Sequence, residues 1–161
     1  MEKKENLLFL LKSNHGALKM LLDDVSEEES MVRGEHDHNH IRWHTGHLIY
    51  AATLTLKTLD DEVQISEKWL GLFKGGSDVS DESADYPAMA ELREKLYDLH
   101  ARMQERVVSI SDADLDRKVE ITPGFESIAM NGALFFCTHE FYHAGQIANM
   151  RKIIGRERAF G

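Results

Sequence analysis

Long apolar stripes with helical spacing are the feature that most limits how this chain can fold. Apolar residues recur at spacings of three and four along four stretches, and the 161 residues include only two prolines. This period places the apolar side chains on one face of an α-helix. Helices of this kind bury their apolar faces by packing together. The sequence therefore predicts an all-α protein: a four-helix bundle with two long irregular connections, forming a single domain over residues 1–161.

Residues that start and stop helices mark the expected boundaries. Asn39 is an acceptable N-cap for the second helix, and Pro87 suits the first turn of the third. Gly155 is a good C-terminal cap for the last helix. The four helices are expected over residues 6–24, 39–59, 87–110 and 128–154.

Two connections between these helices carry features of their own. In the first, Trp69 and Phe73 are too apolar to be freely solvated, so we expect a short helical turn that packs back on the bundle. The second contains a turn at Pro123 and Gly124, with a short extended piece over residues 119–121.

The overall charge limits the partners. A net charge of −9 argues against nucleic acid and anionic membrane surfaces. The apolar run near the N-terminus is too short to cross a bilayer.

Cys137 is the single cysteine, so no internal disulfide can form, and its place in the last helix favours a small buried apolar side chain. We expect a cytoplasmic protein.

The run HEFYH, from His139 to His143, is the motif with the clearest chemistry. Two histidines four apart lie on one face of a helix and can bind one metal ion. The pattern H-E-x-x-H is typical of zinc proteases with the glutamate, here Glu140, as general base. One protease class needs Gly and His three and six residues after the second histidine, where this chain has Gln146 and Asn149. The protease interpretation is therefore disfavoured.

A third histidine lies on another helix. On the last helix, His139 and His143 share the apolar stripe that includes Phe136 and Ile147, so both point into the bundle. His47 lies on the apolar face of the second helix and completes a three-histidine set.

Two motifs resemble those of the DinB/YfiT-like family of metalloenzymes. NHIRWHTGHL, with Asn39, Trp43, Gly46 and His47, resembles the first motif of that family, and HEFYHAGQIANMRKIIG resembles the last. The resemblance implies a four-helix bundle whose three histidines hold a divalent metal, carried over here to His47, His139 and His143. It also implies a homodimer. Described relatives include metal-dependent thiol S-transferases that use bacillithiol, and mycothiol-dependent enzymes are related.

Three functions remain open at this point. The first is a metal-dependent enzyme acting on a small-molecule substrate, with transfer of a low-molecular-weight thiol to an electrophile. The second is metal-dependent hydrolysis of a small substrate, and the third is non-catalytic metal binding in a stress response. Three histidines suit Zn, Ni, Fe or Mn, as well as Cu, so the ligands do not select the metal. We expect the pocket to lie between the first, second and last helices.

Other polar residues are weaker candidates. Glu140 lies about 100° around the helix from His139, which favours an interhelical or surface carboxylate over a catalytic base. Gln146 is a candidate partner of a ligand, or it closes the pocket floor. His15 either reaches the cavity or is a hydrogen-bonded core histidine, and His44 is an alternative ligand. Three further histidines are expected to be solvated in a loop: His36, His38 and His40.

Overall fold

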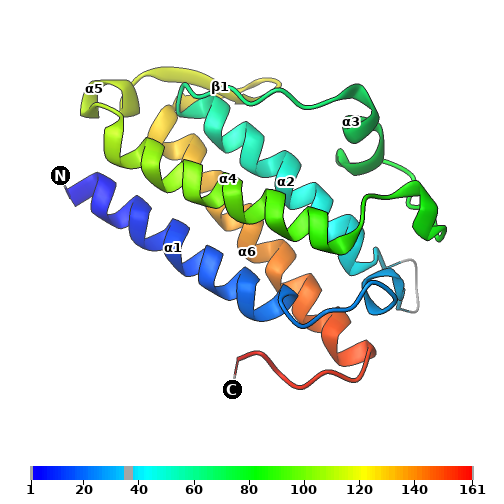
Figure 1. Cartoon of the computed structure of the whole chain (residues 1–161). Helices are drawn as coiled ribbons and strands as arrows, with labels where there is room; N and C mark the ends of the chain where they lie inside the picture. The colour runs from blue at the N-terminus through cyan, green and yellow to red at the C-terminus, as the bar shows by residue number, and fades with distance from the viewer. Residues whose placement is uncertain (1, 35–37, 161) are drawn as a thin grey trace.

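The computed structural model describes residues 2–34 and 38–160, and its frame is four long helices (Figure 1). The four-helix bundle expected from the apolar stripes is confirmed. The helices are α1 (Glu2–Leu22), α2 (Ile41–Thr58), α4 (Met89–Ser109) and α6 (Ala129–Ile153).

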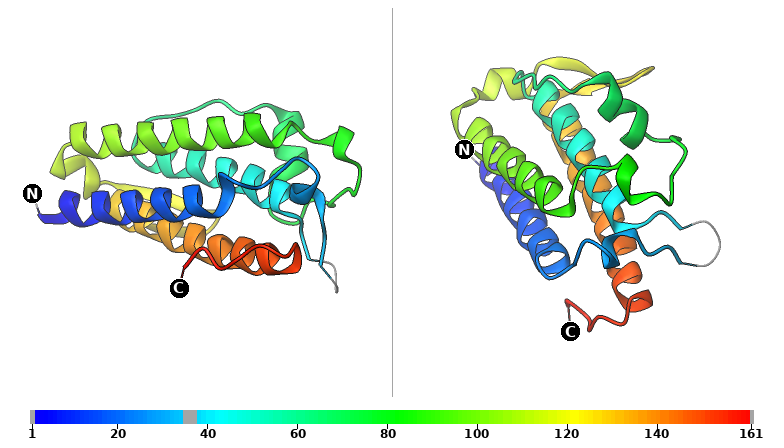
Figure 2. Two further views of the ribbon diagram at one scale, coloured as in Figure 1. Left: turned by 60° about the horizontal axis from the view of Figure 1, so that its bottom comes forward. Right: turned by 45° about the vertical axis from the view of Figure 1, so that its right-hand side comes forward.

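The packing order of these helices decides where a site can form. α2 packs against both α4 and α6, and α1 packs against the same two helices. The four helices run side by side, as the two turned views show (Figure 2). Because α2 and α6 are neighbours, side chains on their facing sides can meet.

Shorter elements fill the connections. α3 (Glu67–Phe73) packs against α2, which confirms the expected apolar turn, and Phe73 is fully buried. The expected extended piece is strand β1 (Lys118–Thr122), which pairs antiparallel with β2 (Phe125–Ile128) around the expected turn at Pro123 and Gly124. The sequence analysis missed β2. The remaining elements are the 3₁₀ turns η1 (Glu29–Met31) and η2 (Ser83–Asp85) and the short helix α5 (Asp112–Leu115).

The hairpin is placed close to the interface between α2 and α6. β1 contacts both helices, and β2 contacts α6 (Figure 1). A small apolar cluster joins the three elements through Ala51, Ile121 and Phe136. The hairpin therefore covers one end of the seam between the two helices.

Several expected boundaries need correction. α1 begins four residues before Asn6, and α4 begins at Met89 rather than at Pro87. The N-cap of α2 is His40, not Asn39: Nδ1 of His40 accepts a hydrogen bond of 2.9 Å from the backbone N–H of Trp43. The end of α6 is as expected, because Gly155 follows it with a φ of 79°.

The buried face of α1 includes a polar residue. Asn14 is buried in the core, and the neighbouring His15 is only partly buried. α1 packs against α4 and α6 together, which buries Leu7, Leu11, Leu18, Leu21 and Leu22. None of the described helices is long and apolar enough to cross a membrane.

Candidate metal centre

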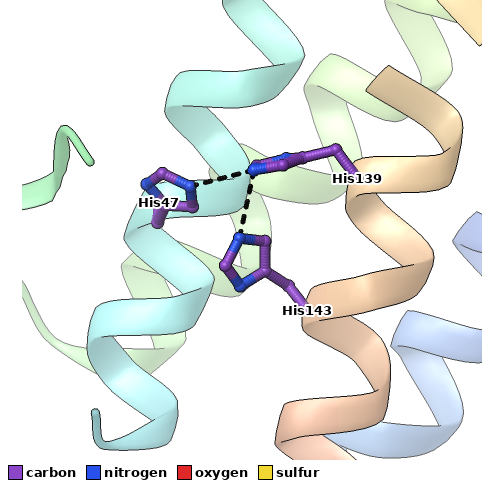
Figure 3. Close-up of side chains that lie close together, drawn as sticks. All are labelled: His47, His139 and His143. Atoms are coloured by element: carbon purple, nitrogen blue, oxygen red, sulfur yellow. Dashed lines mark hydrogen bonds between the residues drawn. The ribbon is translucent and has the colours of Figure 1, made fainter. Parts of the chain in front are cut away.

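Three histidine side chains meet at the seam between α2 and α6 (Figure 3). Nε2 of His139 lies 3.4 Å from Nε2 of His47 and 3.2 Å from Nε2 of His143. His139 and His143 come from successive turns of α6, and His47 faces them from the middle of α2. The sequence placed these three side chains together, and the structure shows that arrangement.

The two distances from Nε2 of His139 to the other two nitrogen atoms fit ligands of a single ion. Histidine nitrogen binds Zn²⁺ at about 2.0–2.1 Å, so two ligands in tetrahedral positions lie about 3.3 Å apart. The observed distances of 3.2 and 3.4 Å agree with this value. One ligand atom from each histidine lies within 4.8 Å of the others. These three histidines could hold a metal ion.

His47 is held in the tautomer that a ligand needs. Its Nδ1 lies 2.7 Å from the carbonyl oxygen of Phe73, at the end of α3, so Nδ1–H donates to that oxygen. The lone pair of Nε2 is then free to bind a metal. The indole of Trp43 stacks on one face of the ring, with centroids 4.8 Å apart and planes 8° apart. Trp43 also donates through Nε1 to the carbonyl oxygen of Leu72 at 3.0 Å.

His143 has a partner on α2. Its Nδ1 lies 3.2 Å from Nδ1 of His44. A metal bound at Nε2 of His143 requires hydrogen on Nδ1 of that ring, and Nδ1 of His44 is placed to accept it. His44 therefore contacts a candidate ligand instead of joining the three converging Nε2 atoms.

Burial keeps these rings neutral near pH 7. It lowers the pKa of His47 and of His139, and it lowers the pKa of His143 to about 3. The neighbouring histidines add to the effect at His139 and His143, because positive charges would repel one another. Neutral imidazoles are the form that binds a metal.

Glu140 is directed into the core beside α1 and α4. Its Oε2 accepts a hydrogen bond of 2.8 Å from Nδ2 of Asn14, and its Oε1 lies 2.9 Å from Nε2 of His100. This arrangement is the interhelical alternative considered for Glu140. Asn14 and His100 were not identified from the sequence. The helical period alone did not reveal them, because it does not show which polar residue faces a neighbouring helix.

Of the two weaker candidates His15 and Gln146, only Gln146 lies beside a candidate ligand. Nδ1 of His15 lies 3.3 Å from Nε2 of Gln104, and the ring packs against Tyr97, so His15 is the hydrogen-bonded histidine between α1 and α4. Gln146 lies beside His143, and its Nε2 donates to the hydroxyl of Tyr142 at 3.3 Å. Gln146 is therefore placed next to a candidate ligand.

The remaining candidates are outside the centre. His38 is exposed, as expected, and His36 lies outside the described residues. The expectation for His40 is wrong: the ring is fully buried because it caps α2. Cys137 is buried, as expected, and burial raises the pKa of its thiol to about 12.

Comparison with known proteins places the chain in a family. A family model described as the DinB superfamily matches residues 10–147. Among solved structures, a conserved protein from Enterococcus faecalis has a similar fold, with a TM-score of 0.72 and 15% identity over 94% of this chain and 97% of that one. No curated protein matches the sequence. The family match covers most of the chain, including all three histidines, and the chain belongs to the DinB superfamily.

Proposed function

We propose that His47, His139 and His143 bind one divalent transition metal and that the protein is a metal-dependent enzyme acting on a small molecule. The observation that carries the proposal is the convergence of three histidine side chains, with Nε2 of His139 at metal-ligand spacing from Nε2 of both His47 and His143. Three neutral ligands leave a bound ion its full charge, which lowers the pKa of a coordinated thiol or water toward neutral.

The reaction that we propose is transfer of a low-molecular-weight thiol to an electrophile. The thiol sulfur forms a bond to the electrophilic carbon, the leaving group departs with its electron pair, and the thiol proton passes to solvent. His47, His139 and His143 act as ligands in this scheme and transfer no proton. The resemblance to bacillithiol-dependent transferases supports the choice of thiol.

The protein's own nucleophiles support a role for an external thiol. Cys137 is buried, and its pKa of about 12 keeps it protonated at neutral pH. A thiol reacts as its thiolate, so Cys137 is a poor nucleophile. Glu140 contacts Asn14 and His100 instead of the metal centre. The attacking group would therefore come from the substrate side.

The metal content tests the first part of the proposal. Protein purified without an affinity tag should contain about one equivalent of metal by elemental analysis, and His47→Ala, His139→Ala and His143→Ala should each lose most of it. His38→Ala is the matched control because that ring is exposed. Full metal content in the His47→Ala variant would refute the three-histidine assignment.

Turnover tests the second part. Metal-replete protein would be given bacillithiol, glutathione, cysteine or coenzyme A with a chloro-dinitroaromatic or epoxide acceptor, and compared with metal-free protein. A rate that needs both metal and thiol supports transfer. Hydrolysis of a small ester or amide without thiol would instead favour a hydrolase, and binding without any turnover would favour a metal-binding stress protein.

We further propose that the protein is a homodimer. Several large apolar side chains are exposed on the long helices, including Phe9 of α1 and Phe141 of α6. A second copy would cover such residues. Sedimentation at micromolar concentration should give a dimer, and a monomer there would contradict this part of the proposal.

A further inference from the structure

A cleft of about 260 Å³ opens beside the converging nitrogen atoms, between α2, α6 and the hairpin. We name it the aromatic cleft. Two of the candidate ligands, His47 and His139, form part of its lining. A molecule in this cleft therefore lies against the metal centre.

The rest of the lining follows from the helical period. On α2, Tyr50, Ala51 and Leu54 are three, four and seven residues after His47, so they continue its face. On α6, Phe136 and Phe135 are three and four residues before His139. The two helix faces that supply ligands thus also supply an apolar wall.

The aromatic cleft contains no charged side chain among the described residues that line it. Its polar groups, apart from the two histidines, belong to Tyr50 and Thr122. Phe135 is held at the wall by Phe125 of the hairpin and by Phe136, with ring centroids 6.1 and 5.4 Å away. A charged group placed here would lose hydration without gaining an ionic partner, whereas an apolar group would gain from burial.

A second cleft, of about 460 Å³, has a different character. It lies along the later part of α6 and is lined by amide side chains, among them Asn39, Gln146 and Asn149. None of the three candidate ligands belongs to its lining, although His44 does. Of these two clefts, only the aromatic cleft therefore gives direct access to a candidate ligand.

We propose that the aromatic cleft binds an uncharged aryl or alkyl group of the small molecule that reacts at the metal centre. This inference rests on the proposed metal site and adds the class of substrate. The cleft is smaller than the roughly 300–1,000 Å³ typical of sites for drug-sized ligands, so the group is about the size of one ring.

Two azoles that differ in one ring test this inference. Cobalt-substituted protein would be titrated with 1-methylimidazole and 1-benzylimidazole, and binding followed by the visible cobalt bands. Both compounds coordinate through the same ring nitrogen, and only the second carries a phenyl group. We expect 1-benzylimidazole to bind about tenfold more tightly, because its phenyl group would be buried in the cleft.

Matched variants locate the phenyl group. Phe135→Glu should abolish the preference for 1-benzylimidazole, measured as the ratio of the two azole affinities in the same variant. Phe141→Glu is the control, because Phe141 is on the same helix, is 57% exposed and is outside the lining. If Phe135→Glu does not fold or load cobalt, Leu54→Gln makes the same test from α2.

The outcomes separate this inference from the metal site. Failure of the wild-type protein to bind cobalt would refute the proposed function. Cobalt binding with equal affinity for the two azoles, or with no response to either, would overturn the inference about the cleft alone. A benzyl preference that survives both Phe135→Glu and Leu54→Gln would also overturn it, because the phenyl group would then bind elsewhere.

Discussion

Nδ1 of His44 and Nδ1 of His143 lie 3.2 Å apart, so one buried histidine on α2 holds another on α6. Partners of this kind orient a metal ligand and fix its tautomer. We predict that His44→Ala retains the three ligands and loses about 10- to 100-fold in metal affinity. Competition against a chelator of known affinity measures the loss.

A conservative variant separates orientation from simple packing at the same position. His44→Asn retains a hydrogen-bonding side chain and should recover part of the affinity, whereas His44→Leu should not. If His44→Ala instead eliminated the metal as completely as His143→Ala, His44 would be a ligand.

Gly46 is a point of close approach between α2 and α3. A Cβ atom at this position would lie 2.1 to 2.4 Å from three ring atoms of Phe73, which is fully buried. We predict that Gly46→Ala lowers the free energy of unfolding by about 1–3 kcal/mol. It should also weaken metal binding, because Phe73 supplies the carbonyl oxygen that orients His47.

Gly16 provides the control for that variant. It lies in α1 with nothing within 4 Å of a Cβ atom, so Gly16→Ala should stabilise the protein by about 0.5–1 kcal/mol. Urea unfolding and zinc affinity would be measured for both variants. Equal stability of Gly46→Ala and the wild type would show that α3 shifts easily to make room for the added methyl group.

Protons should compete with the metal for the three histidines only at unusually low pH. Burial lowers the pKa of His47 and of His139, and it brings the pKa of His143 to about 3. Because protons compete only as pH approaches the pKa of the free ligand, zinc affinity should stay nearly constant from pH 8 to about 6.5 and fall at lower pH. A solvent-exposed histidine peptide should lose affinity from a higher pH. A steep fall between pH 8 and 6.5 would contradict the prediction.

Glu140 should matter for stability and little for the metal. Its carboxylate lies between Asn14 and His100 in the core. We predict that Glu140→Gln lowers the free energy of unfolding by about 1–3 kcal/mol and leaves the metal content unchanged. Loss of metal with unchanged stability would instead place the side chain in the centre.

The helical period was enough to find the three histidines. His139 and His143 share one face of α6, and His47 lies on the apolar face of α2, so a bundle in which these helices are neighbours brings all three together. The predicted position of the pocket, between the first, second and last helices, agrees only in part with the aromatic cleft. The aromatic cleft is lined by α2, α6 and the hairpin, and α1 contributes none of its described lining residues.

The parts that sequence reasoning missed depend on tertiary contacts. The carbonyl group of Phe73 is a backbone atom, so no residue type reveals that it orients His47. The cap of α2 is a ring nitrogen of His40, whereas the sequence favoured Asn39. The position of that ring depends on the surrounding core, which the sequence pattern does not show. Strand β2 is four residues long and is stabilised by its pairing with β1.

The position of Trp43 makes its fluorescence sensitive to an ion at the candidate metal centre. The chain has two tryptophans, and this one lies flat against His47, with its ring centroid 4.8 Å away. Fluorescence from an indole so close to a paramagnetic ion is quenched, whereas Zn²⁺ has no unpaired electrons with which to quench it. Binding or exchange of such an ion at this centre would thus be visible in the protein's own fluorescence, with no added label.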